Sequence, residues 1–218
     1  MILRFAIIGL LLGAAAPVAP EENKTDLRPP FNGRWLVAWG GDTKELNQHH
    51  DNRGQKFAFD FLGVGDGGKT RRGAGKTNED YYAFGREILA PADGTVTEAI
   101  DGVRDNAPGS MNPYSALGNA AIIEHRPGEV SVLAHLKQGS VAVKAGDKVK
   151  AGQVLGLCGN SGNSSEPHVH YHLQNTPVIQ DGTGIKIRFA SVGLVGKDGR
   201  AEAKAGYSPV KGEVIEAP

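Results

Sequence analysis

The sequence predicts an all-β fold, and three observations support that prediction. The chain of 218 residues contains 31 glycines, while hydrophobic residues make up 39%, a composition that favours short strands and tight turns over long helices. From Tyr81 onward, short apolar runs alternate with turns rich in glycine, proline and asparagine. No stretch shows the apolar periodicity of a helix longer than about two turns.

The expected strands follow one another with little intervening structure. Turn residues such as Pro91-Ala92-Asp93-Gly94 and Arg126-Pro127-Gly128 separate neighbouring runs, and the second of these joins a predicted hairpin. The expected strands lie in residues 31–41, 56–62, 88–99 (two strands), 119–125, 129–136, 141–156 (strands and turns), 168–172 and 185–189.

The N-terminus predicts export. Arg4 is followed by an apolar run from Phe5 to Leu12, which has the length of a signal-peptide core and is too short for a bilayer anchor. Small residues at 13–16 offer a cleavage site. We therefore expect a signal peptide at 1–19, no stable membrane anchor after its removal, and a periplasmic or secreted protein.

The rest of the chain divides into three parts. Residues 20–46 are expected to form a polar leader and a first strand, 47–178 a peptidase-like domain, and 179–218 a C-terminal β extension. The formal net charge is zero and there is no basic run, so nucleic acid is not an expected partner. Cys158 is the only cysteine, which excludes an internal disulfide. It lies in an apolar run and is expected to be a buried, inert thiol.

Residues 63–70 match the phosphate-binding P-loop pattern and follow a predicted strand. A working P-loop must lead into a helix whose N-terminus faces the phosphates. The residues that follow, 71–78, contain two more glycines and no apolar periodicity. We therefore expect a long loop here and no nucleotide binding.

Three of the seven histidines lie at alternate positions in one predicted strand: His168, His170 and His172. Alternate residues of a strand point to the same face, so these imidazoles can converge on one ion. Asp60 interrupts an otherwise apolar strand, where a carboxylate is costly unless it is paired or binds a metal. His135 ends another apolar strand and could equally be a histidine satisfied within the core.

The order and spacing of several motifs resemble the lysostaphin-type, LytM-like zinc metalloendopeptidases of peptidoglycan. The similarity covers roughly residues 47–175. The matching motifs are Asp60, Ala90-Pro91-Ala92-Asp93-Gly94, Ala134-His135-Leu136, Gly146-Asp147-Lys148-Val149 with Gly152-Gln153, Gly159-Asn160-Ser161-Gly162-Asn163-Ser164 and Pro167-His168-Val169-His170.

The resemblance implies a fold, a cofactor and a division of roles. It implies antiparallel sheets forming a sandwich or barrel-like domain with long loops. It implies that Asp60 and His170 bind zinc, while His135 and His168 act on the attacking water and on the developing oxyanion. Zinc brings the pKa of bound water to about 7 and polarises an amide carbonyl. The implied substrate is the peptide portion of peptidoglycan.

One position departs from the family pattern. The usual first zinc ligand is a histidine four residues before the aspartate, and this position holds Lys56, whose charge would oppose a metal. The loop upstream offers His49 and His50 instead, and some relatives share such a cluster. We choose His49, with His50 as the close alternative. The other interpretation is a degenerate domain that binds peptidoglycan or regulates a hydrolase without cutting.

The remaining candidates carry less weight. His172 is expected either to contact a zinc ligand without binding the metal itself or to lie at the edge of the substrate. His125 is expected to be exposed. Asn119 and Tyr114 are possible substrate contacts. A biotinyl or lipoyl carrier domain is a third alternative, because residues 90–96 and 143–153 resemble the two halves of that barrel. No lysine flanked by methionines supports it, because the only methionines are Met1 and Met111.

Overall fold

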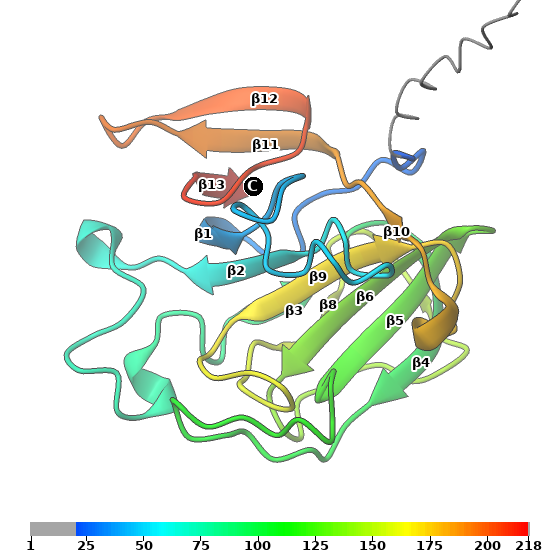
Figure 1. The fold of residues 1–218 in the computed structure, drawn as a ribbon, viewed down its shortest axis with the longest axis horizontal. Coiled ribbons are helices and arrows are strands. Elements are labelled where there is room, and N and C mark those ends of the chain that lie inside the picture. Colours follow the sequence, from blue (N-terminus) through cyan, green and yellow to red (C-terminus); the bar gives the residue numbers. More distant parts are fainter. Residues whose placement is uncertain (1–20, 218) are drawn as a thin grey trace, which may run out of the picture.

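The computed structural model describes residues 21–217, and its regular secondary structure consists almost entirely of antiparallel strands joined by turns and long loops (Figure 1). One sheet of eleven strands runs in the order β12-β11-β13-β1-β2-β9-β6-β5-β4-β7, with β10 added to β9, and β3 and β8 form a second small sheet. The all-β prediction is confirmed. The strands are β1 (Gly33–Trp39), β2 (Phe59–Gly63), β3 (Glu87–Leu89), β4 (Gly94–Ile100), β5 (Asn119–Arg126), β6 (Glu129–Leu136), β7 (Lys148–Val149), β8 (Val154–Leu157), β9 (Val169–Gln174), β10 (Gly184–Ile185), β11 (Phe189–Val195), β12 (Ala201–Tyr207) and β13 (Val214–Ala217).

The alternation of side chains along β2 and β9 gives the large sheet two chemically different faces. Phe59 lies opposite Tyr171 and Phe61 lies opposite Val169, and all four side chains are buried in the main core. Between them Asp60 lies opposite His170 and points to the other face. The sequence pattern of these two strands therefore directs aromatic side chains into the core and titratable ones to the site.

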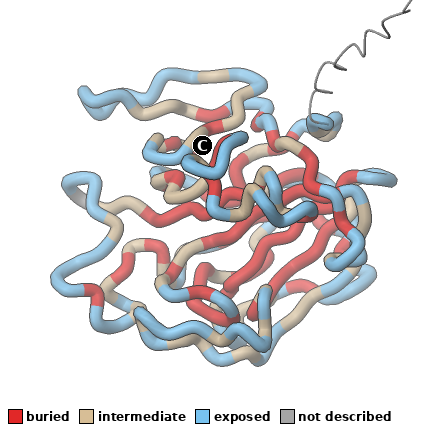
Figure 2. Tube along the Cα trace, viewed as in Figure 1, coloured by how far each residue is buried: buried red, intermediate tan, exposed pale blue. Residues whose placement is uncertain are grey.

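The core face of the large sheet is covered by the small sheet and by aromatic residues near the N-terminus. Ile88 of β3 and Leu155 of β8 belong to the same buried cluster as Phe59 and Phe61. Phe31 stacks on Trp35, with ring centroids 4.5 Å apart, and meets Phe61 edge-on. Figure 2 shows that buried residues are concentrated along the central strands. This packing buries the core side of the strands that carry the site.

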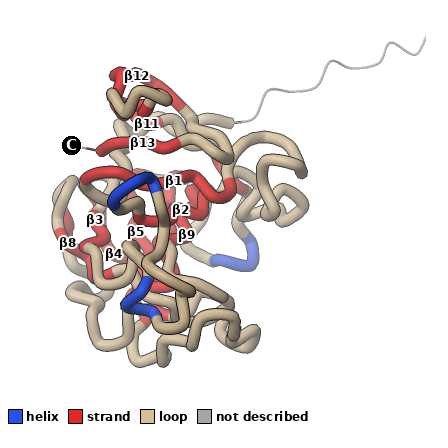
Figure 3. The backbone as a smooth tube through the Cα atoms, turned by 90° about the vertical axis from the view of Figure 1, so that its left-hand side faces the viewer, coloured by secondary structure: helices blue, strands red, loops and turns tan. Residues whose placement is uncertain are grey.

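The C-terminal strands extend the same sheet. β13 pairs with β1, which in turn pairs with β2, and β11 joins β13 to β12 (Figures 1 and 3). The expected domain limits at 47 and 178 thus fall between strands of one continuous sheet, and they remain a prediction.

The stretch that matches the P-loop pattern does not form the structure that such a loop requires. After β2 ends at Gly63 the chain makes the 3₁₀ turn η1 (Asp66–Gly68), and Gly67 and Gly68 both have positive φ. No α-helix follows, because the other helical turns among the described residues are only η2 (Asn78–Asp80) and η3 (Ile179–Asp181). The loop prediction is confirmed.

The expected signal peptide at 1–19 lies outside the described residues. Within 21–217, no helix is long and apolar enough to cross a membrane.

Cys158 is expected to resist thiol reagents in the native protein. Its side chain is fully buried, and burial raises the pKa of the thiol, so little nucleophilic thiolate forms near neutral pH. We expect no reaction with a disulfide reagent such as dithionitrobenzoate at pH 8 until denaturant is added, and then one thiol per chain. The exposed variant Ala116→Cys is the control and should react at once with one equivalent. Modification of Cys158 in the folded protein would contradict this burial.

Candidate functional site

Asp60 is the centre of a group of side chains that can bind a metal. His170 Nδ1 lies 2.9 Å from Asp60 Oδ1, and His49 Nε2 lies 2.9 Å from Asp60 Oδ2. One potential ligand atom from each residue falls within 4.8 Å of the others. Two imidazoles and one carboxylate form a donor set that suits zinc and leave room for a further ligand.

The structure brings His49, and not His50, to Asp60. His49 lies in the loop before β2, which folds back over the start of that strand. The Nδ1 atom of His50 instead contacts Asp51 Oδ1 at 3.2 Å. The side chain of Lys56 is exposed, with its ammonium 5.7 Å from the Phe57 ring centroid. The lysine in the usual ligand position is therefore an exposed residue outside the group formed by His49, Asp60 and His170.

Asn47 holds this loop in place. Its side chain is fully buried, and its Nδ2 atom donates to the carbonyl oxygens of Gly41, Lys56 and Ala58 at 3.1–3.2 Å. Its Oδ1 atom accepts a hydrogen bond from the backbone N–H of His49 at 3.0 Å. Sequence reasoning missed Asn47 as a scaffold residue, because its partners are backbone atoms that only the folded loop assembles.

A second residue of the loop also escaped the sequence analysis. The amide of Gln48 donates to Asp60 Oδ2 at 2.8 Å, the same oxygen that His49 approaches. Gln48 stands next to His49 in a polar loop, and nothing in the sequence distinguished it from the other polar residues there. Both side chains therefore converge on one carboxylate oxygen.

His135 and His168 are each held by a backbone carbonyl through Nδ1. His135 Nδ1 lies 2.9 Å from the Ser161 carbonyl oxygen, and His168 Nδ1 lies 2.8 Å from that of Glu166. A carbonyl can only accept, so each Nδ1 carries a hydrogen, and in the neutral form of either ring the lone pair is on Nε2. His168 Nε2 lies 3.6 Å from Asp60 Oδ1. The two rings lie with centroids 4.8 Å apart.

The backbone of His135 is strained. Its φ of 65° is the only positive value of a non-glycine residue within 21–217, and such conformations occur mostly where function or packing imposes them. The backbone N–H of His135 donates to the Leu117 carbonyl at 2.9 Å. This contact and the contact of its ring with Ser161 hold His135 at the edge of the site.

The loop from Asn160 to Ser164 supplies the frame for both histidines. Ser161 Oγ donates to the Leu136 carbonyl at 2.7 Å, and Ser164 Oγ donates to Asn160 Oδ1 at 2.7 Å. Asn160, Ser161 and Ser164 are all buried. Gly118 must be glycine here, because its φ is +62° and a Cβ atom would lie 2.5 Å from Ser161.

Charge and burial oppose one another at Asp60. Burial would raise the pKa of this carboxyl, but the imidazoles of His168, His170 and His49 hold it well below the usual range. Burial would lower the pKa of His168, but the neighbouring Asp60 carboxylate raises it. For His135, burial lowers the pKa well below its usual value. Asp60 is thus an anion that needs positive charge around it.

Behind His170, away from Asp60, lie two further polar residues of β9. His170 Nε2 lies 2.9 Å from His172 Nδ1, and His172 Nε2 lies 3.1 Å from Gln174 Oε1. Burial lowers the pKa of His172 to about 3. With 1% of its surface exposed, His172 is not at the edge of a substrate site. Gln174 was missed in the sequence because nothing marked it beyond its place in the same alternation.

The remaining candidates do not join the site. Asn119 is fully buried and its Nδ2 atom donates to the carbonyls of Val103 and Leu136, so it is a structural residue. Tyr114 is 98% exposed. The expectation of an exposed His125 was wrong, because this ring is half-buried and contacts the Asp93 carbonyl and Ser131 Oγ at 2.9 and 2.7 Å.

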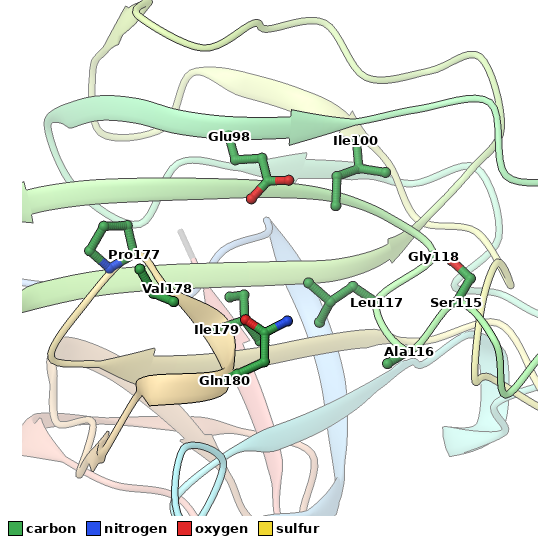
Figure 4. Close-up of a pocket in the computed structure, with 10 residues that line it drawn as sticks. All are labelled: Glu98, Ile100, Ser115, Ala116, Leu117, Gly118, Pro177, Val178, Ile179 and Gln180. Atoms are coloured by element: carbon green, nitrogen blue, oxygen red, sulfur yellow. The ribbon is translucent and has the colours of Figure 1, made fainter.

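Two surface hollows are relevant to the site. A small one of about 120 Å³ opens on Asp60 and His168 and is bordered by Trp39 and Glu166. A larger one of about 490 Å³ lies beside Glu98 and Ile100 of β4, between the loop 115–118 and the segment 177–180 (Figure 4).

The larger hollow is separated from the histidines. Cross-strand partners lead from His172 through Val132 and Ile122 to Glu98 on one face of the sheet. Leu117 and Ile179 pack over Val132 and Ile122. The small hollow is therefore the opening that reaches the candidate metal ligands.

Comparison with known proteins supports the same family as the sequence motifs. The family model described as Peptidase family M23 matches residues 78–185. The matched segment contains His135, His168 and His170, whereas His49 and Asp60 lie before it.

Two curated relatives illustrate the similarity. "Cell division protein DipM" of Caulobacter vibrioides is 29% identical over 153 residues, which are 70% of this chain and 23% of the relative. "Peptidoglycan DD-endopeptidase ShyA" of Vibrio cholerae is 40% identical over 105 residues, which are 48% of this chain and 21% of the relative. The chain thus spans about a quarter of the length of these relatives or less.

A solved structure is also similar. The catalytic domain of lysostaphin from Staphylococcus simulans gives a TM-score of 0.41 at 21% identity, over 70% of this chain and 88% of that one. The family match and the curated relatives lead to one conclusion: the chain carries a LytM-type domain of peptidase family M23.

Proposed function

We propose that this protein is an exported zinc endopeptidase that hydrolyses the peptide cross-links of bacterial peptidoglycan. The proposal rests on one observation above all: His49, Asp60 and His170 present their ligand atoms within 4.8 Å of one another. The printed names of relatives such as "Peptidoglycan DD-endopeptidase ShyC" and "DD-carboxypeptidase/endopeptidase Mpg" supply the substrate class.

The donor set fits zinc. His49 contributes Nε2, His170 contributes Nδ1, and Asp60 is a buried carboxylate whose surroundings keep it ionised. These three side chains would hold the ion, and the small hollow beside His168 opens on the same Asp60. When bound, zinc polarises a carbonyl oxygen and makes water acidic enough to lose a proton near neutral pH.

His135 and His168 would move the proton. Their Nδ1–H groups are fixed on the carbonyls of Ser161 and Glu166, so Nε2 of each ring is ready to accept a proton from the attacking water. Once protonated, the same Nε2–H can donate to the oxyanion or to the departing amine. Fixed rings also avoid the cost of orienting a general base during the reaction.

The first prediction concerns metal content. The native protein should bind one zinc per chain, measured by metal analysis after stripping and reloading. His49→Ala should weaken binding by at least about 100-fold, since losing even a group that merely supports a ligand costs 10–100-fold.

His50→Ala is the matched control and should leave binding unchanged, because its ring contacts Asp51 instead. If the native protein binds no zinc after reloading, the peptidase proposal is contradicted, and a domain that binds peptidoglycan without cutting it is favoured.

The second prediction concerns catalysis. His168→Ala should lower kcat by roughly 10²–10⁴-fold, the usual contribution of a general acid or base, while zinc content stays at one per chain. The measurement is release of muropeptide fragments from purified sacculi. Unchanged turnover would remove His168 from the mechanism. Zinc-loaded native protein that binds sacculi but releases no fragments would identify a silent binding domain.

A further inference from the structure

A row of hydrogen-bonded side chains runs along β9 behind His170. It consists of His170, His172 and Gln174, which share one face of the strand and are 3%, 1% and 0% exposed. The two contacts are 2.9 Å between His170 Nε2 and His172 Nδ1, and 3.1 Å between His172 Nε2 and Gln174 Oε1. Buried polar groups are almost always hydrogen-bonded, so each hydrogen in this row must have a defined place.

The backbone beyond β9 decides how the Gln174 amide is oriented. Its Nε2 atom donates to the carbonyl oxygens of Thr176 at 2.7 Å and Val178 at 3.4 Å. Carbonyl oxygens only accept, so the NH₂ group must lie on that side and Oε1 must face His172. Gly182 allows the amide to sit there, because a Cβ atom on that residue would lie 2.3 Å from Gln174 Oε1.

This orientation propagates to both imidazoles. Because Gln174 Oε1 only accepts, His172 Nε2 must carry a hydrogen. A buried, neutral imidazole then has no hydrogen on Nδ1, so His172 Nδ1 accepts from His170 Nε2–H. The hydrogen of His170 is thereby held on Nε2, and its Nδ1 lone pair points at Asp60, whose Oδ1 lies 2.9 Å away.

We propose that His172 and Gln174 are positioning residues that fix the Nε2–H tautomer of His170 and so reserve its Nδ1 atom for the metal. This inference rests on the proposed metal site. Two lone-pair atoms, His170 Nδ1 and Asp60 Oδ1, then face each other, an arrangement that a cation stabilises. In the other tautomer, Nδ1–H would have to be removed before the ion could bind.

The first test measures tautomers in the metal-free protein. Long-range ¹H–¹⁵N correlation spectra distinguish Nε2–H from Nδ1–H rings, and we expect Nε2–H on both His170 and His172. In Gln174→Leu, which removes the acceptor, His172 should no longer be confined to one tautomer. An Nδ1–H form of His170 in the native protein would overturn the proposal whatever the metal affinity.

The second test measures zinc affinity by competition with a chromophoric chelator. His172→Ala should weaken binding by about 10–100-fold, the usual effect of removing a partner behind a metal ligand. His172→Asn should recover most of that loss, because its Oδ1 atom occupies the position of the missing Nδ1 acceptor. A merely structural role would not distinguish these two variants once both are shown to fold by thermal unfolding.

His125→Ala is the matched control. His125 is a half-buried histidine on β5 with two hydrogen-bond partners, and it does not contact the site. Its loss should leave zinc affinity unchanged.

The outcomes separate this inference from the proposed function. If the native chain binds zinc and His49→Ala abolishes binding, equal affinities of His172→Ala and the native protein would overturn the positioning role alone. If the native chain binds no zinc, the proposed function fails and the inference falls with it.

Discussion

Asp60 lies in the middle of a buried strand, between two phenylalanines, and its carboxylate cannot remain charged there without compensation. The loop before β2 supplies part of that compensation, because Gln48 donates to Asp60 Oδ2 and His49 Nε2 lies 2.9 Å from the same oxygen. The negative charge therefore organises its surroundings. Imidazoles that contact a carboxylate in this way can also bind a metal ion beside it.

The surrounding loops limit where hydrogens can be. Backbone carbonyls fix His135 and His168 through Nδ1, and the hydrogen-bonded row behind His170 fixes that ring through Nε2. His135 and His168 thus present Nε2 toward the site, whereas His170 presents Nδ1. Preorganisation of this kind reduces the reorganisation needed when a substrate carbonyl enters. It depends on buried polar side chains. Asn47 bonds only backbone groups, whereas Asn160 bonds the side chains of Asn78 and Ser164 and the backbone carbonyl of Asn106.

The large sheet connects the site to the rest of the molecule. Its core face packs aromatic residues against the small sheet of β3 and β8, while the opposite face bears the titratable residues. A one-residue slip between β2 and β9 would exchange these faces and bury Asp60 in the core. The packing of Phe59 and Phe61 therefore fixes the register on which the geometry of the site depends. The same sheet continues through β1 to the C-terminal strands.

The sequence by itself determined the all-β class, the strand alternation that places Asp60, His170 and His172 on one face, and the family motifs. These depend on local patterns with a period of two residues, which are legible without coordinates. The tertiary structure alone decided that His49 rather than His50 meets Asp60, that Lys56 is exposed and that His125 is half-buried. It also revealed Asn47, Gln48 and Gln174. Each of these depends on contacts between segments that are distant in the sequence, and no local pattern records such contacts.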